Sequence, residues 1–92
     1  MNNNQQDIAI DVGLEILCAR LDADLTQTQL AKKIGTKQSG VARVERGRVL
    51  ASIPFLSRVA KATDHILVIE LLPKDERVSS KNTFTSELTL SL

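Results

Sequence analysis

A cluster of basic side chains lies in the middle of the chain, among polar groups that can recognise nucleic-acid bases. Residues 32–48 carry a net charge of +5, although the whole chain of 92 residues carries only +1, which leaves −4 for the rest. A local excess of positive charge is typical of a phosphate-binding surface even when the total charge is small. The charged residues of this stretch are Lys32, Lys33, Lys37, Arg43, Arg46 and Arg48, with Glu45 as the one acid.

Side chains that could support catalysis or hold a metal are few and scattered. His65 is the single histidine and Cys18 the single cysteine, and neither has Cys, His or carboxylate neighbours at ligand spacing. We therefore expect no enzyme activity, no metal site and no cofactor. Cys18 lies in an apolar stretch that ends at Leu21, so core packing is the expected role of its side chain.

A short helix is predicted just before the basic cluster. Thr26 is followed three residues later by Gln29, the capping-box pattern that satisfies the first amides of a helix. Apolar residues recur at helical spacing as far as Ile34, and Gly35 can adopt the left-handed conformation that ends a helix. The pattern predicts a helix over residues 27–34 that ends in a tight turn.

A second short helix should follow that turn directly. Thr36 is the expected N-cap, Val41 and Val44 form the buried side, and Gly47 ends the helix. Gly40 lies inside this helix and should cost about 1 kcal/mol relative to alanine. The outward positions carry side chains that hydrogen-bond bases or phosphates: Lys37, Gln38, Ser39 and Arg43.

Residues 8–64 resemble the helix-turn-helix domain of the Cro, cI and Xre repressor family. The resemblance rests on the spacing of Leu25-Thr26-Gln27, Gln29-Leu30-Ala31, Gly35-Thr36, Gln38-Ser39, Val41, Arg43, Glu45-Arg46-Gly47-Arg48, Phe55-Leu56 and Val59-Ala60-Lys61-Ala62. It implies a mainly α, lambda-repressor-like domain of about four helices that binds double-stranded DNA at a palindromic operator.

The resemblance also implies roles for particular side chains. The second helix of the motif would enter the major groove, where Lys37, Gln38, Ser39 and Arg43 would read bases. Phosphate contacts would come from Gln27, Arg46 and Arg48. Arg20 and Glu45 would form a structural ion pair between the first helix and the end of the recognition helix.

Two further helices are expected to complete the domain. The first would span residues 7–21, after a polar arm at residues 1–6, and Gly13 would weaken it locally. The last would begin after Ser52, with Pro54 in its first turn, and would end at residues 63–64. The DNA-binding domain is therefore predicted to span residues 7–64.

Residues 65–73 are rich in leucine and β-branched side chains and stop at a proline, so they predict a strand. A lone strand needs a partner, and the same strand of a second subunit would supply it. The resulting homodimer would form a two-stranded sheet, as in the Xre-like antitoxins that this arrangement resembles. The expected dimer contacts are Ile66, Leu67, Val68, Ile69 and Leu71.

The tail, residues 74–92, is polar at first and then alternates between apolar and polar side chains over residues 83–92. The alternation leaves three readings open: a disordered tail, a strand added to the dimer sheet, or a strand added to a partner such as a toxin. The residues that would bind such a partner are Phe84, Leu88, Leu90 and Leu92.

Composition narrows the classes of ligand and location. Only two phenylalanines and no other large aromatic residue are present, which predicts an aliphatic core and disfavours single-strand binding by base stacking. No apolar run is long enough to span a membrane, and a cytoplasmic location is expected.

The sequence as a whole predicts a dimeric repressor, and specifically the antitoxin of a toxin-antitoxin module, which represses its own operon and neutralises its toxin. The alternatives are a phage-type or other Xre-family regulator, or a protein-interaction module that binds DNA weakly.

Overall fold

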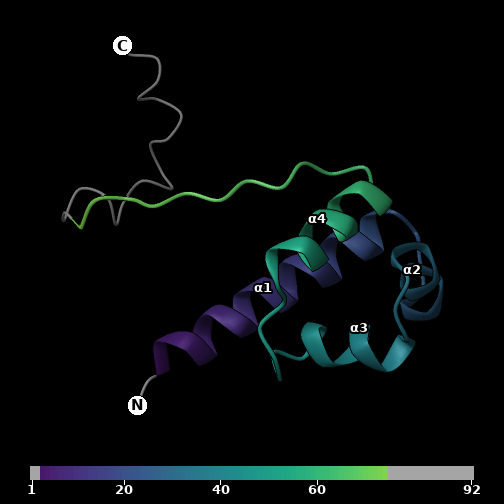
Figure 1. The fold of residues 1–92 in the computed structure, drawn as a ribbon, viewed down its shortest axis with the longest axis horizontal. Coiled ribbons are helices and arrows are strands. Elements are labelled where there is room, and N and C mark those ends of the chain that lie inside the picture. The colour runs from purple at the N-terminus through teal and green to yellow at the C-terminus, as the bar shows by residue number, and fades with distance from the viewer. Residues whose placement is uncertain (1–2, 75–92) are drawn as a thin grey trace, which may run out of the picture.

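The computed structural model describes residues 3–74, and these residues form four helices joined by short turns (Figure 1). The helices are α1 (Asn3–Asp22), α2 (Gln27–Ile34), α3 (Gln38–Glu45) and α4 (Ile53–Ala62). The long α1 packs against both α3 and α4, and α2 packs against α3 and α4 in turn. The predicted mainly helical class with about four helices is confirmed for this part of the chain.

Helix α1 begins at Asn3, four residues before its predicted start at Asp7. The polar composition of residues 1–6 suggested an arm, but these residues contain neither glycine nor proline, and glutamine is a good helix former. Residues 3–6 therefore belong to α1.

Both ends of α2 are closed as predicted. The Thr26 hydroxyl accepts from the Gln29 amide at 3.0 Å, and the Gln29 side chain accepts from the Thr26 amide at 2.8 Å. Gly35 has a φ of 76°, and the Thr36 amide donates to the Ala31 carbonyl at 2.9 Å. These bonds fix the turn that leads into α3.

The prediction that Thr36 caps α3 is wrong. The N-cap is Lys37, whose backbone is extended and whose side chain makes no capping bond. Since α3 begins at Gln38, Thr36 lies one residue too early to be its N-cap, and its amide instead takes part in closing α2. The far end of α3 is as predicted: Gly47 has a φ of 73°, and the Arg48 amide donates to the Arg43 carbonyl at 3.0 Å.

The core between the helices is aliphatic, as the composition predicted. Helix α4 begins after the N-cap Ser52, whose hydroxyl accepts from the Phe55 amide at 3.2 Å, and it ends before Thr63. Phe55 packs at the edge of the core rather than inside it. The buried cluster consists of Ile16, Leu30, Ala31, Ile34, Val41, Val44, Ala51 and Val59.

Cys18 is exposed, so the expectation that it packs in the core is wrong. The buried face of α1 includes Ile16 and Arg20. Cys18 is two residues from each, which is about 200° around a helix, so its side chain points to solvent.

Helices α1 and α3 approach each other closely at Gly13 of α1. A Cβ atom there would lie 2.8 Å from the Glu45 carbonyl oxygen and closer still to that of Val44. The absence of a side chain therefore lets the last turn of α3 rest on α1. Since Gly13 was expected only to weaken its helix, this packing role is an addition from the structure.

Beyond α4, the His65 amide donates to the Ala60 carbonyl at 2.8 Å, and residues 66–74 then continue as an extended segment (Figure 1). Among residues 3–74, no helix or strand includes this segment. Ile66 is 88% and Leu71 98% exposed; Val68 and Ile69 are also exposed, and Leu67 is half-buried. The tail residues singled out by their alternation, 83–92, lie outside the described residues.

Candidate nucleic-acid interface

Helices α2 and α3 form the corner that would face DNA. The two helices pack against each other, and Ala31 of α2 is buried in the core cluster that also contains Val41 and Val44 of α3. On α3, Val41 and Val44 point into the core. The packing therefore decides which side of α3 is left for a ligand.

The side chains predicted to read bases lie on the outer side of α3 and at its start. Lys37, Gln38, Ser39 and Arg43 are all exposed, and Ser39 and Arg43 are one helical turn apart. Gly40 is half-buried, and a Cβ atom added to it would meet the Thr36 hydroxyl at 3.1 Å. The absence of a side chain at Gly40 therefore affects its packing against Thr36 in the preceding turn.

Cations flank this row of polar side chains. Arg46 and Arg48 are exposed on the turn that follows α3, and Lys32 and Lys33 are exposed at the end of α2. The two ends of the motif thus carry positive charge, with polar hydrogen-bonding groups between them. This is the arrangement that a DNA-binding surface needs, since phosphates lie on both sides of a groove.

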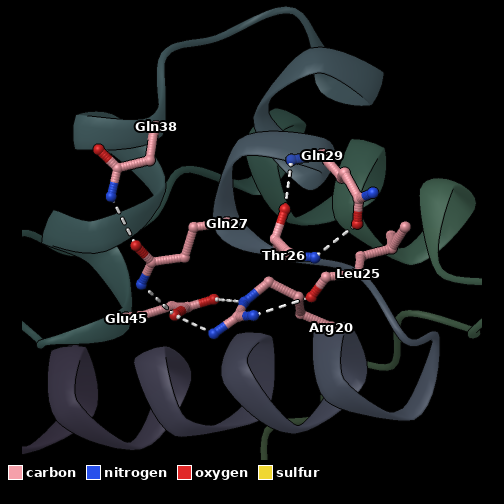
Figure 2. A network of polar contacts seen from close by, with 7 residues as sticks. All are labelled: Arg20, Leu25, Thr26, Gln27, Gln29, Gln38 and Glu45. Carbon is pink, nitrogen blue, oxygen red and sulfur yellow. Dashed lines mark hydrogen bonds and ion pairs between the residues drawn. The ribbon is translucent and has the colours of Figure 1, made fainter.

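An ion pair behind the interface joins α1 to α3. Arg20 donates through Nε to Glu45 Oε2 at 2.7 Å and through Nη2 to Glu45 Oε1 at 3.1 Å (Figure 2). Its Nη1 donates to the Leu25 carbonyl at 2.8 Å. Both side chains are buried, so this two-pronged pair holds the last turn of α3 in place.

Gln27 connects this buried pair to the recognition helix. Its Nε2 donates to Glu45 Oε1 at 2.9 Å, and its Oε1 accepts from Gln38 Nε2 at 2.6 Å (Figure 2). Sequence reasoning assigned Gln27 a phosphate contact and did not foresee these bonds. The sequence gives little indication of these bonds, because the three residues are far apart in the chain and only the folded structure brings them together.

The described residues offer little support for other kinds of site. Among residues 3–74, no group of three or more His, Cys, Asp or Glu side chains could hold a metal ion. No helix in this same range is long and apolar enough to cross a bilayer. All buried side-chain nitrogen and oxygen atoms of the described residues have hydrogen-bond partners.

Comparison with known families agrees with this geometry. A helix-turn-helix family model matches residues 19–66, which cover α2, α3 and α4. The chain therefore belongs to the helix-turn-helix family of the Cro/C1 type, a family of DNA-binding regulatory domains and not of enzymes. No curated protein and no solved structure shows a significant match. The chain is accordingly a DNA-binding transcription regulator.

Proposed function

We propose that the protein is a sequence-specific transcriptional repressor that inserts α3 into the major groove of its own operator. The observation that carries this proposal is the exposed polar row on α3, flanked by cations and backed by the buried Arg20–Glu45 pair. Binding of a regulator over a promoter excludes polymerase, which makes repression the simplest outcome.

Within this proposal, the exposed side chains divide into two groups. Lys37, Gln38, Ser39 and Arg43 read base edges, because they project from the first two turns of α3. Arg46, Arg48 and the remaining N–H of Gln27 contact phosphates and fix the register of the helix.

The division is tested by two arginine variants. Arg43→Ala should lose about 1–3 kcal/mol of binding free energy on the preferred site and relax specificity, because a base contact disappears. Arg48→Ala should weaken binding to all sequences similarly and lower the salt dependence, because a phosphate contact disappears. Affinities of both variants for cognate and scrambled duplexes give the comparison. Equal losses on both duplexes for both variants would contradict this division.

We further propose that the protein acts as a homodimer through residues 66–71. Within residues 3–74, no backbone hydrogen bond joins residues 66–74 to the helices, so their amides and carbonyls are available to a second strand. Pairing this segment with its symmetry copy would cover Ile66, Val68 and Leu71 and give the two-fold symmetry that a palindromic operator requires. Half-sites would lie about one helical turn, roughly 10 bp, apart.

Val68→Pro tests this dimer. Proline removes a ladder hydrogen bond and should convert the dimer to a monomer, while helices α1 to α4 stay folded because Val68 is exposed in the single chain. Val68→Thr, which keeps a β-branched side chain, is the matched control and should stay dimeric. Sedimentation equilibrium reads out the mass, and a Val68→Pro variant that sediments as the wild type does would rule out the strand pairing.

The finer proposal is that the repressor is an antitoxin of the cytoplasm, which represses its own operon and neutralises a neighbouring toxin. Its support is the sequence alone: a helix-turn-helix domain followed by a dimerising strand and an alternating tail with Phe84, Leu88, Leu90 and Leu92. A toxin-like gene next to this one favours the antitoxin, and a divergent phage-type gene order favours a phage repressor.

Truncation of the tail separates the two activities. Removal of residues 79–92 should abolish toxin binding by removing the strand that adds to the toxin, and should leave DNA affinity within about twofold of wild type. Pull-down of the co-expressed toxin and anisotropy with operator DNA measure the two effects. Unchanged toxin capture by the truncated chain would eliminate the tail as the toxin-binding segment.

A further inference from the structure

A cleft lies between α1 and the connection from α3 to α4, which passes beside α1 (Figure 1). Its volume is about 630 Å³, which lies within the range of roughly 300–1,000 Å³ that is typical of sites for small molecules. Gly47 rests directly on Ile10 in this cleft, since a Cβ atom added to Gly47 would lie 2.7 Å from Ile10 Cγ1. The lining residues are Gln6, Ala9, Ile10, Arg46, Gly47, Arg48, Val49 and Leu50.

One part of the cleft is apolar although it is open to solvent. Ile10 is 43%, Val49 39% and Leu50 45% exposed, and all three line the cleft. Single exposed apolar side chains are common on protein surfaces, but large ones gathered in a cleft are typical of a binding site. This part of the lining suits an aliphatic chain.

The other part of the lining is cationic. Arg46 and Arg48 are exposed, and within residues 3–74 neither side chain pairs with a carboxylate. Guanidinium groups bind carboxylates and phosphates through their forked N–H donors. The cleft therefore presents positive charge that is available to an anion, directly beside apolar surface.

DNA alone accounts for only half of this lining. A DNA phosphate would use the two guanidinium groups, but it carries no aliphatic chain to cover Ile10 and Leu50. A neutral apolar molecule would leave both arginines unused, and a small inorganic anion would leave the apolar part in water. A molecule with an anionic head group and an aliphatic chain matches both parts.

We propose that this cleft binds a small amphipathic anion, an aliphatic chain with a carboxylate or phosphate head group, and that this ligand releases the protein from DNA. The chain lies on Ile10, Val49 and Leu50, and the head group occupies Arg46 and Arg48. Because the same two guanidinium groups are proposed to hold DNA phosphates, ligand and DNA compete. The competition rests on the proposed function of α3, whereas binding of the ligand does not.

Binding is tested first without DNA, by isothermal titration calorimetry of the full-length protein with decanoate below the concentration at which it forms micelles. Decanoate should bind at least about tenfold more tightly than decanol, which lacks the charge, and than acetate, which lacks the chain. Decyl phosphate in a parallel titration shows which of the two head groups binds more tightly. Equal affinities for decanoate and decanol would overturn the proposal. Capture of the protein by vesicles of anionic phospholipid, without binding of dissolved decanoate, would overturn it as well.

Leu50→Ser tests where the ligand binds. It removes apolar surface from the cleft and keeps both arginines, so decanoate affinity should fall about tenfold. Leu21→Ser is the matched control, because Leu21 is 58% exposed but lies outside the cleft, and this variant should bind decanoate as the wild type does. In ¹⁵N-labelled wild-type protein, decanoate should shift the backbone amide signals of residues 46–50. Equal affinities of the two variants, or shifts that spare residues 46–50, would show that decanoate binds elsewhere and would refute the site.

Release from DNA is measured by fluorescence anisotropy with DNA from upstream of the protein's own gene. Saturating decanoate should weaken wild-type binding by about tenfold or more, relative to sodium chloride at equal ionic strength. Leu50→Ser should bind this DNA within about twofold of wild type, because its phosphate contacts remain, and should lose most of the response to decanoate.

Two outcomes separate failure of this inference from failure of the proposed function. Decanoate that binds in the cleft and leaves a sequence-specific DNA complex intact would refute the competition while the proposed function stands. Decanoate that binds in the cleft of a protein without preference for its upstream DNA would support the site and contradict the proposed function, and the release from DNA with it.

Discussion

Gly13→Ala should unfold much of the protein at temperatures where the wild type is stable. The added methyl group would lie 2.8 Å from the Glu45 carbonyl oxygen and nearer to that of Val44. Both neighbours are backbone atoms, so relief requires α1 and α3 to separate. We expect a loss of about 3 kcal/mol or more in the free energy of unfolding, at the upper end for overpacking, or a fall in Tm of roughly 12 °C or more.

Gly40→Ala is the matched control, because it makes the same substitution inside a helix with a different neighbour. The new methyl group would meet only the Thr36 hydroxyl, at 3.1 Å, and that side chain can rotate. The gain in helix propensity, about 1 kcal/mol, should then make the variant as stable as the wild type or more so. Thermal melts should show a lower Tm for Gly13→Ala and an unchanged or higher Tm for Gly40→Ala. A Gly13→Ala protein with the same Tm as the wild type would show that α1 and α3 do not pack at this point.

Glu45→Ala should have the second large effect on stability. Arg20 would keep its bond to the Leu25 carbonyl but lose both bonds to the carboxylate, and its guanidinium would remain buried with an uncompensated charge. Breaking one side of such a pair typically costs about 3–5 kcal/mol. Urea unfolding followed by circular dichroism measures this loss directly.

The double variant Arg20→Met with Glu45→Leu distinguishes two explanations for this loss of stability. Either the unpaired buried charge of Arg20 destabilises the single variant, or the ion pair itself contributes net stability to the wild type. Apolar side chains of similar volume remove both charges, so the double variant should recover most of the stability lost by Glu45→Ala. If the double variant is as unstable as Glu45→Ala alone, the ion pair itself supplies the stability and the orphaned-charge explanation is wrong.

Local signals in the sequence were sufficient for most of the helix boundaries. The capping box at Thr26 and Gln29, the left-handed Gly35 and Gly47, and the Ser52 cap each act within four residues, so they can be found without knowing the fold. Errors occurred where such signals were ambiguous. Thr36 has a side chain typical of a cap but lies one residue before the actual N-cap, Lys37, and the polar start of α1 hid its continuation to Asn3.

Features that depend on tertiary contact were mostly beyond sequence reasoning. Gly13 resembles an ordinary helix-weakening glycine until α3 is seen to rest on it. The bonds from Glu45 through Gln27 to Gln38 join positions 18 and 11 residues apart, and no local pattern marks them. The Arg20–Glu45 pair was expected only through resemblance to a family. The dimerisation strand at residues 65–73 remains a prediction, because a strand of this kind takes its hydrogen bonds from a second chain.

The central proposal, sequence-specific recognition of duplex DNA by α3, is tested most directly by fluorescence anisotropy with DNA from upstream of the protein's own gene and a scrambled duplex of equal composition, at several salt concentrations. We expect the upstream DNA to bind tighter by a factor of about 10³ or more, and this preference to persist as salt weakens both complexes. Weak and equal binding to both duplexes, lost together as salt rises, would contradict the proposal and would leave the basic surface with only nonspecific attraction to phosphate.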